Sequence, residues 1–138
     1  MFGIFGMLKL KFKKKEVSYI IESRLRFLKN NYLFEGDPNT TAKSLVDLSF
    51  TLHSHYFNDS SSLPIAASCL VFYIEPSEDI DFITPYISAA STILSVIEQN
   101  ELKLNFNEND DLLIRQATNI LARKVEDLDK VMGEAGLI

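Results

Sequence analysis

The chain of 138 residues has no tryptophan, one cysteine, five glycines and four prolines. Because glycine and proline are the residues that most often force a turn, their scarcity favours long helices over many short strands. A single cysteine, Cys69, excludes an internal disulfide bond. It stands in the apolar run LPIAASCLVFYI, and this context predicts a buried, unreactive thiol in a protein of a reducing compartment.

The sequence also has no apolar run of the length, about 20 residues, that we expect of a membrane-spanning helix. Its N-terminus, MFGIFGMLKLKFKKKE, places apolar residues before the charged ones, whereas a secretory signal places them after. These two absences predict a cytoplasmic protein.

The residues that are present suffice for a substantial core, since 46% are hydrophobic and ten are phenylalanine. The length is that of one ordinary domain, and no stretch resembles a linker. We therefore expect one helical domain over residues 1–138. Its first 15 residues form a basic and apolar segment, which we expect to be a strand or a tail.

Apolar residues recur at spacings of three and four in four segments, and this period predicts helices. A fifth segment, 64–74, is almost wholly apolar: Pro64 fits the first turn of a helix and the small residues 66–68 favour one, although LVFYI alone could be a buried strand. We therefore expect a mainly α protein, a compact bundle of about five helices. Thr40 or Thr41 is the expected cap of the second helix, and Thr84 with Pro85 the expected start of the fourth. The segments are 17–34, 42–57, 64–74, 85–99 and 110–132.

One hexapeptide occurs almost twice, as LKLKFK at Leu8–Lys13 and as LKLNFN at Leu102–Asn107. Apolar residues alternate with polar ones in both copies, which is the period of a strand with one buried face. Two short strands in a helical protein need hydrogen-bond partners, and the simplest arrangement pairs them with each other. A two-stranded β ribbon of residues 8–13 with 102–107 is one interpretation, and coincidence is the other.

Charge is distributed unevenly along the chain, although the net charge is only −5. Residues 1–30 have a net charge of +6, and residues 31–138 have one of −11. No lysine or arginine occurs in the 59 residues between Lys43 and Lys103. This distribution argues against nucleic acid as the partner, because phosphate binding needs clustered cations across a surface.

The stretch EPSEDID lies in this acidic span and suggests a docking site for a basic protein. Our first functional hypothesis is a small, non-enzymatic interaction protein, such as an inhibitor of the immunity or antitoxin type. In the alternative interpretation the acids serve solubility and favour the start of a helix. The residues expected to bind the partner are Glu75, Glu78, Asp79, Asp81, Phe82 and Tyr86.

The second hypothesis is a peripheral membrane adaptor that is anchored by its N-terminal segment. Against it, the apolar and cationic residues of this segment do not separate on a helical wheel. A second copy of the chain is a further partner that the sequence leaves open. The residues expected to contact a membrane are Phe2, Phe5, Lys9, Lys11, Lys13, Lys14 and Lys15.

Catalytic and metal-binding patterns are missing from the sequence. His53 and His55 are two residues apart and so do not share a helix face, and no Glu-x-x-His motif accompanies them. No glycine-rich phosphate loop is present. We therefore expect no enzymatic activity, no metal and no cofactor.

Overall fold

The computed structural model describes residues 4–57, 59–100 and 103–136, and it includes Phe5 and Met7 by their backbone only. These residues form five α-helices and one short 3-10 helix, and they contain no β-strand. The prediction of a mainly α bundle of about five helices is confirmed. The elements are α1 (Ile4–Asn30), α2 (Pro38–His53), η1 (Ser54–Tyr56), α3 (Ser62–Ile74), α4 (Ile80–Gln99) and α5 (Glu108–Glu134).

Helix α3 is the centre of the bundle, and each of the other four α-helices packs against it. Nine of its 13 residues are buried, because it is apolar around almost its whole circumference. Small residues such as Ala66 and Ala67 allow its neighbours to approach closely. The segment LVFYI, which alone could have been a strand, forms the second half of this helix.

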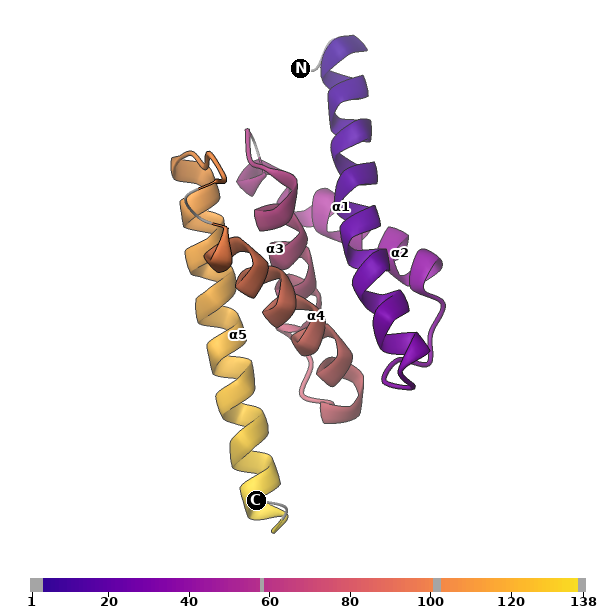
Figure 1. Cartoon of the computed structure of the whole chain (residues 1–138), viewed down its shortest axis with the longest axis vertical. Helices are drawn as coiled ribbons and strands as arrows, with labels where there is room; N and C mark the ends of the chain where they lie inside the picture. The colour runs from indigo at the N-terminus through magenta and orange to yellow at the C-terminus, as the bar shows by residue number, and fades with distance from the viewer. Residues whose placement is uncertain (1–3, 58, 101–102, 137–138) are drawn as a thin grey trace.

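Two long helices, α1 and α5, lie on opposite sides of α3 and α4 (Figure 1). The second half of α1 supplies the core with a row at helical spacing: Val17, Ile21, Leu25 and Leu28. The first half of α1 extends past the bundle at one end, and the last turns of α5 extend past it at the other (Figure 1).

The predicted β ribbon is wrong. Leu8–Lys13 is part of α1, and the described part of the second copy is a turn followed by the approach to α5. Leucine and lysine are strong helix formers, and a helix that has already nucleated gains one hydrogen bond for each residue it adds. Residues 7–30 contain neither glycine nor proline, so nothing stops α1 from continuing back through this segment. Leu102 lies outside the described residues.

Two predicted helix starts are also wrong, because aspartates act as caps. Asp37, not Thr40 or Thr41, caps α2 by accepting a hydrogen bond from the Thr40 backbone N–H at 2.8 Å. This bond also lowers the pKa of Asp37. Asp79 caps α4, which therefore begins five residues before Pro85.

Helix α4 is the one described helix that is long and apolar enough to cross a membrane. The expectation that no segment is long and apolar enough to cross a membrane is therefore wrong, as far as length and composition are concerned. A core helix passes the same test, and α4 serves as one. Its inner face packs against α3 and α5 and comprises Ile83, Tyr86, Ile87, Ala89, Ala90, Ile93 and Ile97.

A buried carboxylate joins the start of α5 to the start of α3. Asp110 is 1% exposed and forms a capping box with Asn107, whose backbone N–H donates to it at 3.0 Å. The same carboxylate accepts from the backbone N–H of Ser61 at 2.6 Å and from the Ser61 hydroxyl at 3.2 Å. Three donors from two separate segments thus depend on one side chain.

We predict that Asp110→Ala lowers the free energy of unfolding by about 3 kcal/mol, because it leaves these donors without their charged acceptor. The matched control is Asp111→Ala, which removes the same charge from the same helix turn at an exposed position. It should cost about 0.5 kcal/mol. Urea unfolding followed by circular dichroism measures both values, and equal losses would contradict the role given to Asp110.

Candidate interaction surface

The first half of α1, residues 4–16, contributes no buried residue among those whose side chains are described. The first buried residue of the helix is Val17. Large apolar side chains are nevertheless exposed before it: Ile4 is 75% exposed and Phe12 is 63% exposed. Exposed apolar residues that occur singly are common, whereas a group of them on one element marks a site of interaction.

Three of these side chains, together with Tyr19 just after Val17, form what we call the outer apolar row: Ile4, Leu8, Phe12 and Tyr19. The first three are four residues apart and so lie on one helix face, and Tyr19 lies close to the same line. By the same geometry, the row points away from the side on which Val17 and Ile21 are buried. The outer apolar row therefore faces away from the bundle.

Lysines border the outer apolar row on both sides. By helical spacing, Lys9 lies on one side of it, Lys11 lies on the other, and Lys15 lies within it between Phe12 and Tyr19. Lys13 lies nearer the buried side of the helix and pairs with Glu16 at 3.9 Å. Lys14 instead points towards α2, where its Nζ is 2.7 Å from Asp47 Oδ1. A helical wheel of the first 15 residues does not show this arrangement clearly, because Leu10 and Lys14 lie on the side of α1 that faces α2. Phe2 and the side chain of Phe5 lie outside what the structure describes.

A groove of about 750 Å³ runs between α1 and α2. It brings Lys43 of α2 to the lysines of α1, which sequence analysis missed because the two segments lie about thirty residues apart. Only the packing of α1 on α2 makes them neighbours. The lining residues are Leu10, Lys11, Lys14, Lys15, Ser18, Tyr19, Glu22, Asn39, Lys43, Val46 and Asp47.

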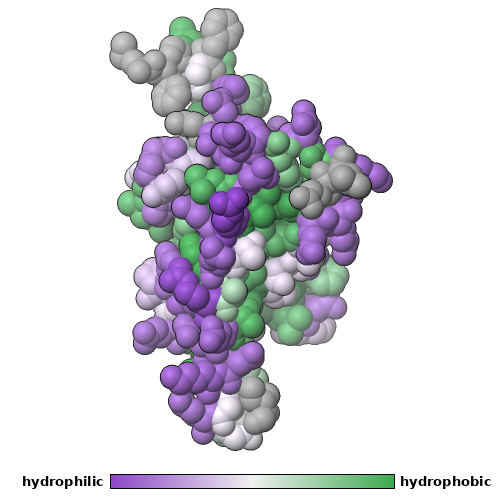
Figure 2. Space-filling view, turned by 90° about the vertical axis from the view of Figure 1, so that its left-hand side faces the viewer, coloured by the Kyte–Doolittle hydropathy of each residue, from purple (hydrophilic) through white to green (hydrophobic). Residues whose placement is uncertain are grey.

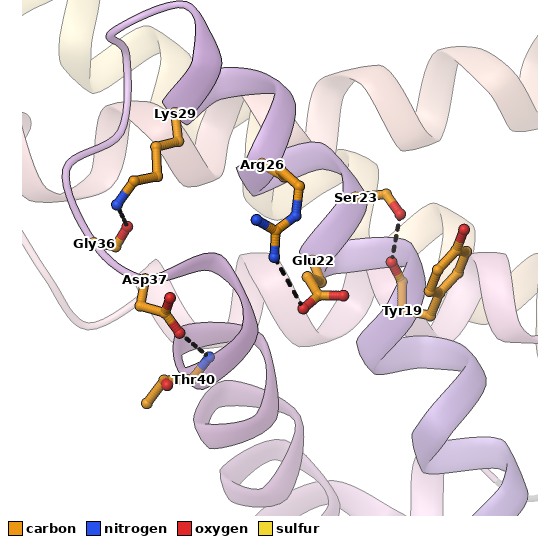
Figure 3. A network of polar contacts seen from close by, with 8 residues as sticks. All are labelled: Tyr19, Glu22, Ser23, Arg26, Lys29, Gly36, Asp37 and Thr40. Carbon is orange, nitrogen blue, oxygen red and sulfur yellow. Dashed lines mark hydrogen bonds and ion pairs between the residues drawn. The ribbon is translucent and has the colours of Figure 1, made fainter.

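The connection between α1 and α2 fixes the far end of this groove (Figure 3). Lys29 Nζ donates a hydrogen bond to the Gly36 carbonyl at 2.9 Å, and the Asp37 cap follows directly. A side chain at Gly36 would not fit, because its Cβ would lie 2.7 Å from Phe34 Cζ. Within α1, Arg26 pairs with Glu22 at 3.4 Å, so the acid at the edge of the groove is already neutralised (Figure 3).

The acidic stretch between α3 and α4 is partly engaged within the fold. Glu75 pairs with Arg123 at 3.4 Å, and Lys124 Nζ donates to the Ser77 carbonyl at 2.6 Å. Asp79 accepts from the Phe82 backbone N–H as the cap of α4. Glu78 and Asp81 are exposed. Two basic residues of α5 thus offset part of the negative charge that the sequence places here.

Tyr86, expected to anchor a partner, is instead buried in an aromatic cluster. Its ring centroid lies 6.0 Å from that of Phe34, 5.2 Å from that of Tyr73 and 5.3 Å from that of Phe82. Burial, with a smaller effect of Tyr73, raises the pKa of Tyr86 to about 12. Of the two expected anchors, only Phe82 offers an exposed ring.

The two histidines have separate surroundings. His53 stacks on Phe72 with ring centroids 4.6 Å apart and is half-buried, whereas His55 is exposed. In the part of the chain that the structure describes, no three His, Cys, Asp or Glu side chains are grouped to hold a metal ion. His53 thus has a packing role at the end of α2.

The opposite side of the molecule presents a different surface. Figure 2 views it from the α5 side, and the end formed by the last turns of α5 is mostly hydrophilic. The exposed charged residues there are Glu126, Asp127, Asp129, Lys130 and Glu134. The combination of exposed apolar side chains with lysines is found at the α1 end.

Cys69 is fully buried in α3, and burial raises the pKa of its thiol to about 12. A raised pKa disfavours the thiolate, so at mildly alkaline pH the reactive form is about a thousandfold scarcer than for an ordinary thiol. We predict that DTNB does not label the native protein while the same protein in urea is labelled rapidly. Rapid labelling of the native protein would contradict the burial of this thiol.

No protein-family model, curated protein or solved structure matches this chain.

Proposed function

We propose that this protein binds the surface of anionic membranes through the first half of α1. The observation that carries the proposal is the outer apolar row, which is exposed, faces away from the bundle and is bordered by lysines on both sides. An interfacial helix needs these features: an apolar face that enters the membrane surface, and cations beside it that reach the lipid phosphates.

The lysines suit this position because their aliphatic stems can follow the apolar row while their ammonium groups remain at head-group level. Each lysine near an anionic leaflet contributes about 1 kcal/mol, and burial of a large apolar side chain contributes about 2 kcal/mol. Several of each on one helix are enough for reversible binding. The attraction acts over about one Debye length, so binding should weaken as salt rises.

The acidic residues of α5 lie where they do not oppose this binding at close range, and the nearby acids Glu16 and Asp47 pair with Lys13 and Lys14. The outer apolar row points away from the bundle, and α5 lies on the far side of α3 and α4 from α1 (Figure 1). A membrane that contacts the row therefore meets the basic first half of α1 first. The acidic end of α5 lies on the far side of the molecule (Figure 1).

The hypothesis of an acidic inhibitor has less support from the described contacts. Glu75 and Asp79 have partners within the fold, and the Tyr86 ring is buried. Glu78, Asp81 and Phe82 remain as exposed groups that could meet a basic protein. A surface of three residues is small for a specific protein interface.

We predict that Leu8→Ser weakens binding to vesicles of phosphatidylcholine and phosphatidylserine about fivefold, because a half-exposed leucine contributes about 1 kcal/mol when it enters the interface. The matched control is Leu112→Ser on α5, since Leu8 and Leu112 are both 46% exposed. The control should bind like the unchanged protein. Sedimentation with vesicles at low salt measures the bound fraction.

Two results would contradict the proposal. One is that the unchanged protein does not sediment with anionic vesicles at low salt. The other is that Leu8→Ser and Leu112→Ser bind equally well, since the outer apolar row would then have no part in binding.

A further inference from the structure

We propose that the groove between α1 and α2 binds the phosphate head group of an anionic lipid. The inference rests on the proposed function, because it assigns a specific lipid contact beside the surface that would enter the membrane. It goes beyond that function, which needs only a negatively charged surface and no particular head group.

The first observation that supports this proposal is the set of charged residues that line the groove. Lys14 is neutralised by Asp47 at 2.7 Å, and Glu22 by Arg26 at 3.4 Å. Lys11, Lys15 and Lys43 remain, and none of them has an ion-pair partner within 4 Å among the described residues. Three unpaired cations from two helices therefore line one groove in a protein whose net charge is −5.

The number of donors favours a phosphate over a carboxylate. A phosphate monoester has a charge of about −1.5 to −2 and three strong acceptor oxygens. Lysine acts as a point charge that binds phosphate without the planar geometry on which arginine–carboxylate pairs depend. Three separate ammonium groups therefore match a terminal phosphate monoester better than they match a serine head group, which has a phosphodiester, a carboxylate and an ammonium group of its own.

The apolar lining indicates that the ligand also has an uncharged part. Val46 is 1% exposed and forms part of the lining, together with Leu10 and Tyr19. The groove volume of about 750 Å³ lies within the range of about 300–1,000 Å³ that is typical of small-molecule sites. It exceeds what a phosphate ion alone would fill, and a glycerol backbone with the first carbons of its acyl chains could occupy the rest.

The position of the groove connects it to the membrane surface. Tyr19 belongs to both the groove and the outer apolar row, and Lys15, which lines the groove, is in line with that row by helical spacing. A lipid could therefore place its head group between α1 and α2 while its chains remain in the membrane that the row contacts. The fixed connection between α1 and α2 holds the two walls in place (Figure 3).

The test uses the full chain and a soluble lipid, dihexanoyl phosphatidic acid, below the concentration at which it forms micelles. Isothermal titration calorimetry should detect its binding, and the double variant Lys15→Gln with Lys43→Gln should weaken this binding at least tenfold. Lys130→Gln, an exposed lysine on α5, is the control and should bind like the unchanged protein. Dihexanoyl phosphatidylcholine and inorganic phosphate should each bind at least tenfold more weakly than the phosphatidic acid.

The inference is overturned if dihexanoyl phosphatidic acid does not bind, or if the double variant binds it as well as the control does. Equal binding of inorganic phosphate would also overturn it, because the groove would then be a site for free phosphate. Leu8→Ser separates the two proposals. It should weaken vesicle binding while leaving the binding of soluble phosphatidic acid unchanged, so either proposal can fail while the other stands.

Discussion

Helix α3 is apolar on nearly every side, and it is stable only if other helices cover it all round. Its nine buried residues are enclosed by α1, α2, α4 and α5, and no other described helix packs extensively against all the others. At 1.5 Å per residue, α3 is about 20 Å long, whereas α1 and α5 are each about 40 Å long. A central helix of this length cannot cover either of them completely, so the first half of α1 and the last turns of α5 extend beyond the core.

The uncovered parts of α1 and α5 differ in the side chains they expose. The end of α5 carries mainly charged side chains, as expected of a helix end that meets only water (Figure 2). The start of α1 instead exposes the outer apolar row between lysines. Exposed apolar residues add little to the stability of a free monomer, and the proposed membrane surface would cover those on the uncovered half of α1. The attached lysines favour a surface that is negatively charged.

Sequence analysis predicted the parts of the fold that depend on periodic burial. The helices around Val17–Leu28 and Ala117–Leu121 follow from apolar spacing alone, because core contacts repeat with each turn. Helix α3 has no such period, and Pro64 and the small residues after it favoured a helix there. Sequence analysis failed where a single contact decides. The alternation of apolar and polar residues in LKLKFK resembled that of a strand. The segment is helical because α1 propagates through it. Whether the Tyr86 ring is buried, and whether Lys43 faces Lys15, depends on how helices far apart in the sequence are packed.

Amide hydrogen exchange, measured on the full chain with and without anionic vesicles, tests the central claim most directly. In the free protein, amides of α3 should exchange slowest and those of residues 4–16 fast, because only α3 is enclosed by other helices. Vesicles of phosphatidylcholine and phosphatidylserine should slow exchange in residues 4–16 and leave α5 unchanged. Slow exchange of residues 4–16 in the free protein, or no change on addition of vesicles, would contradict the account.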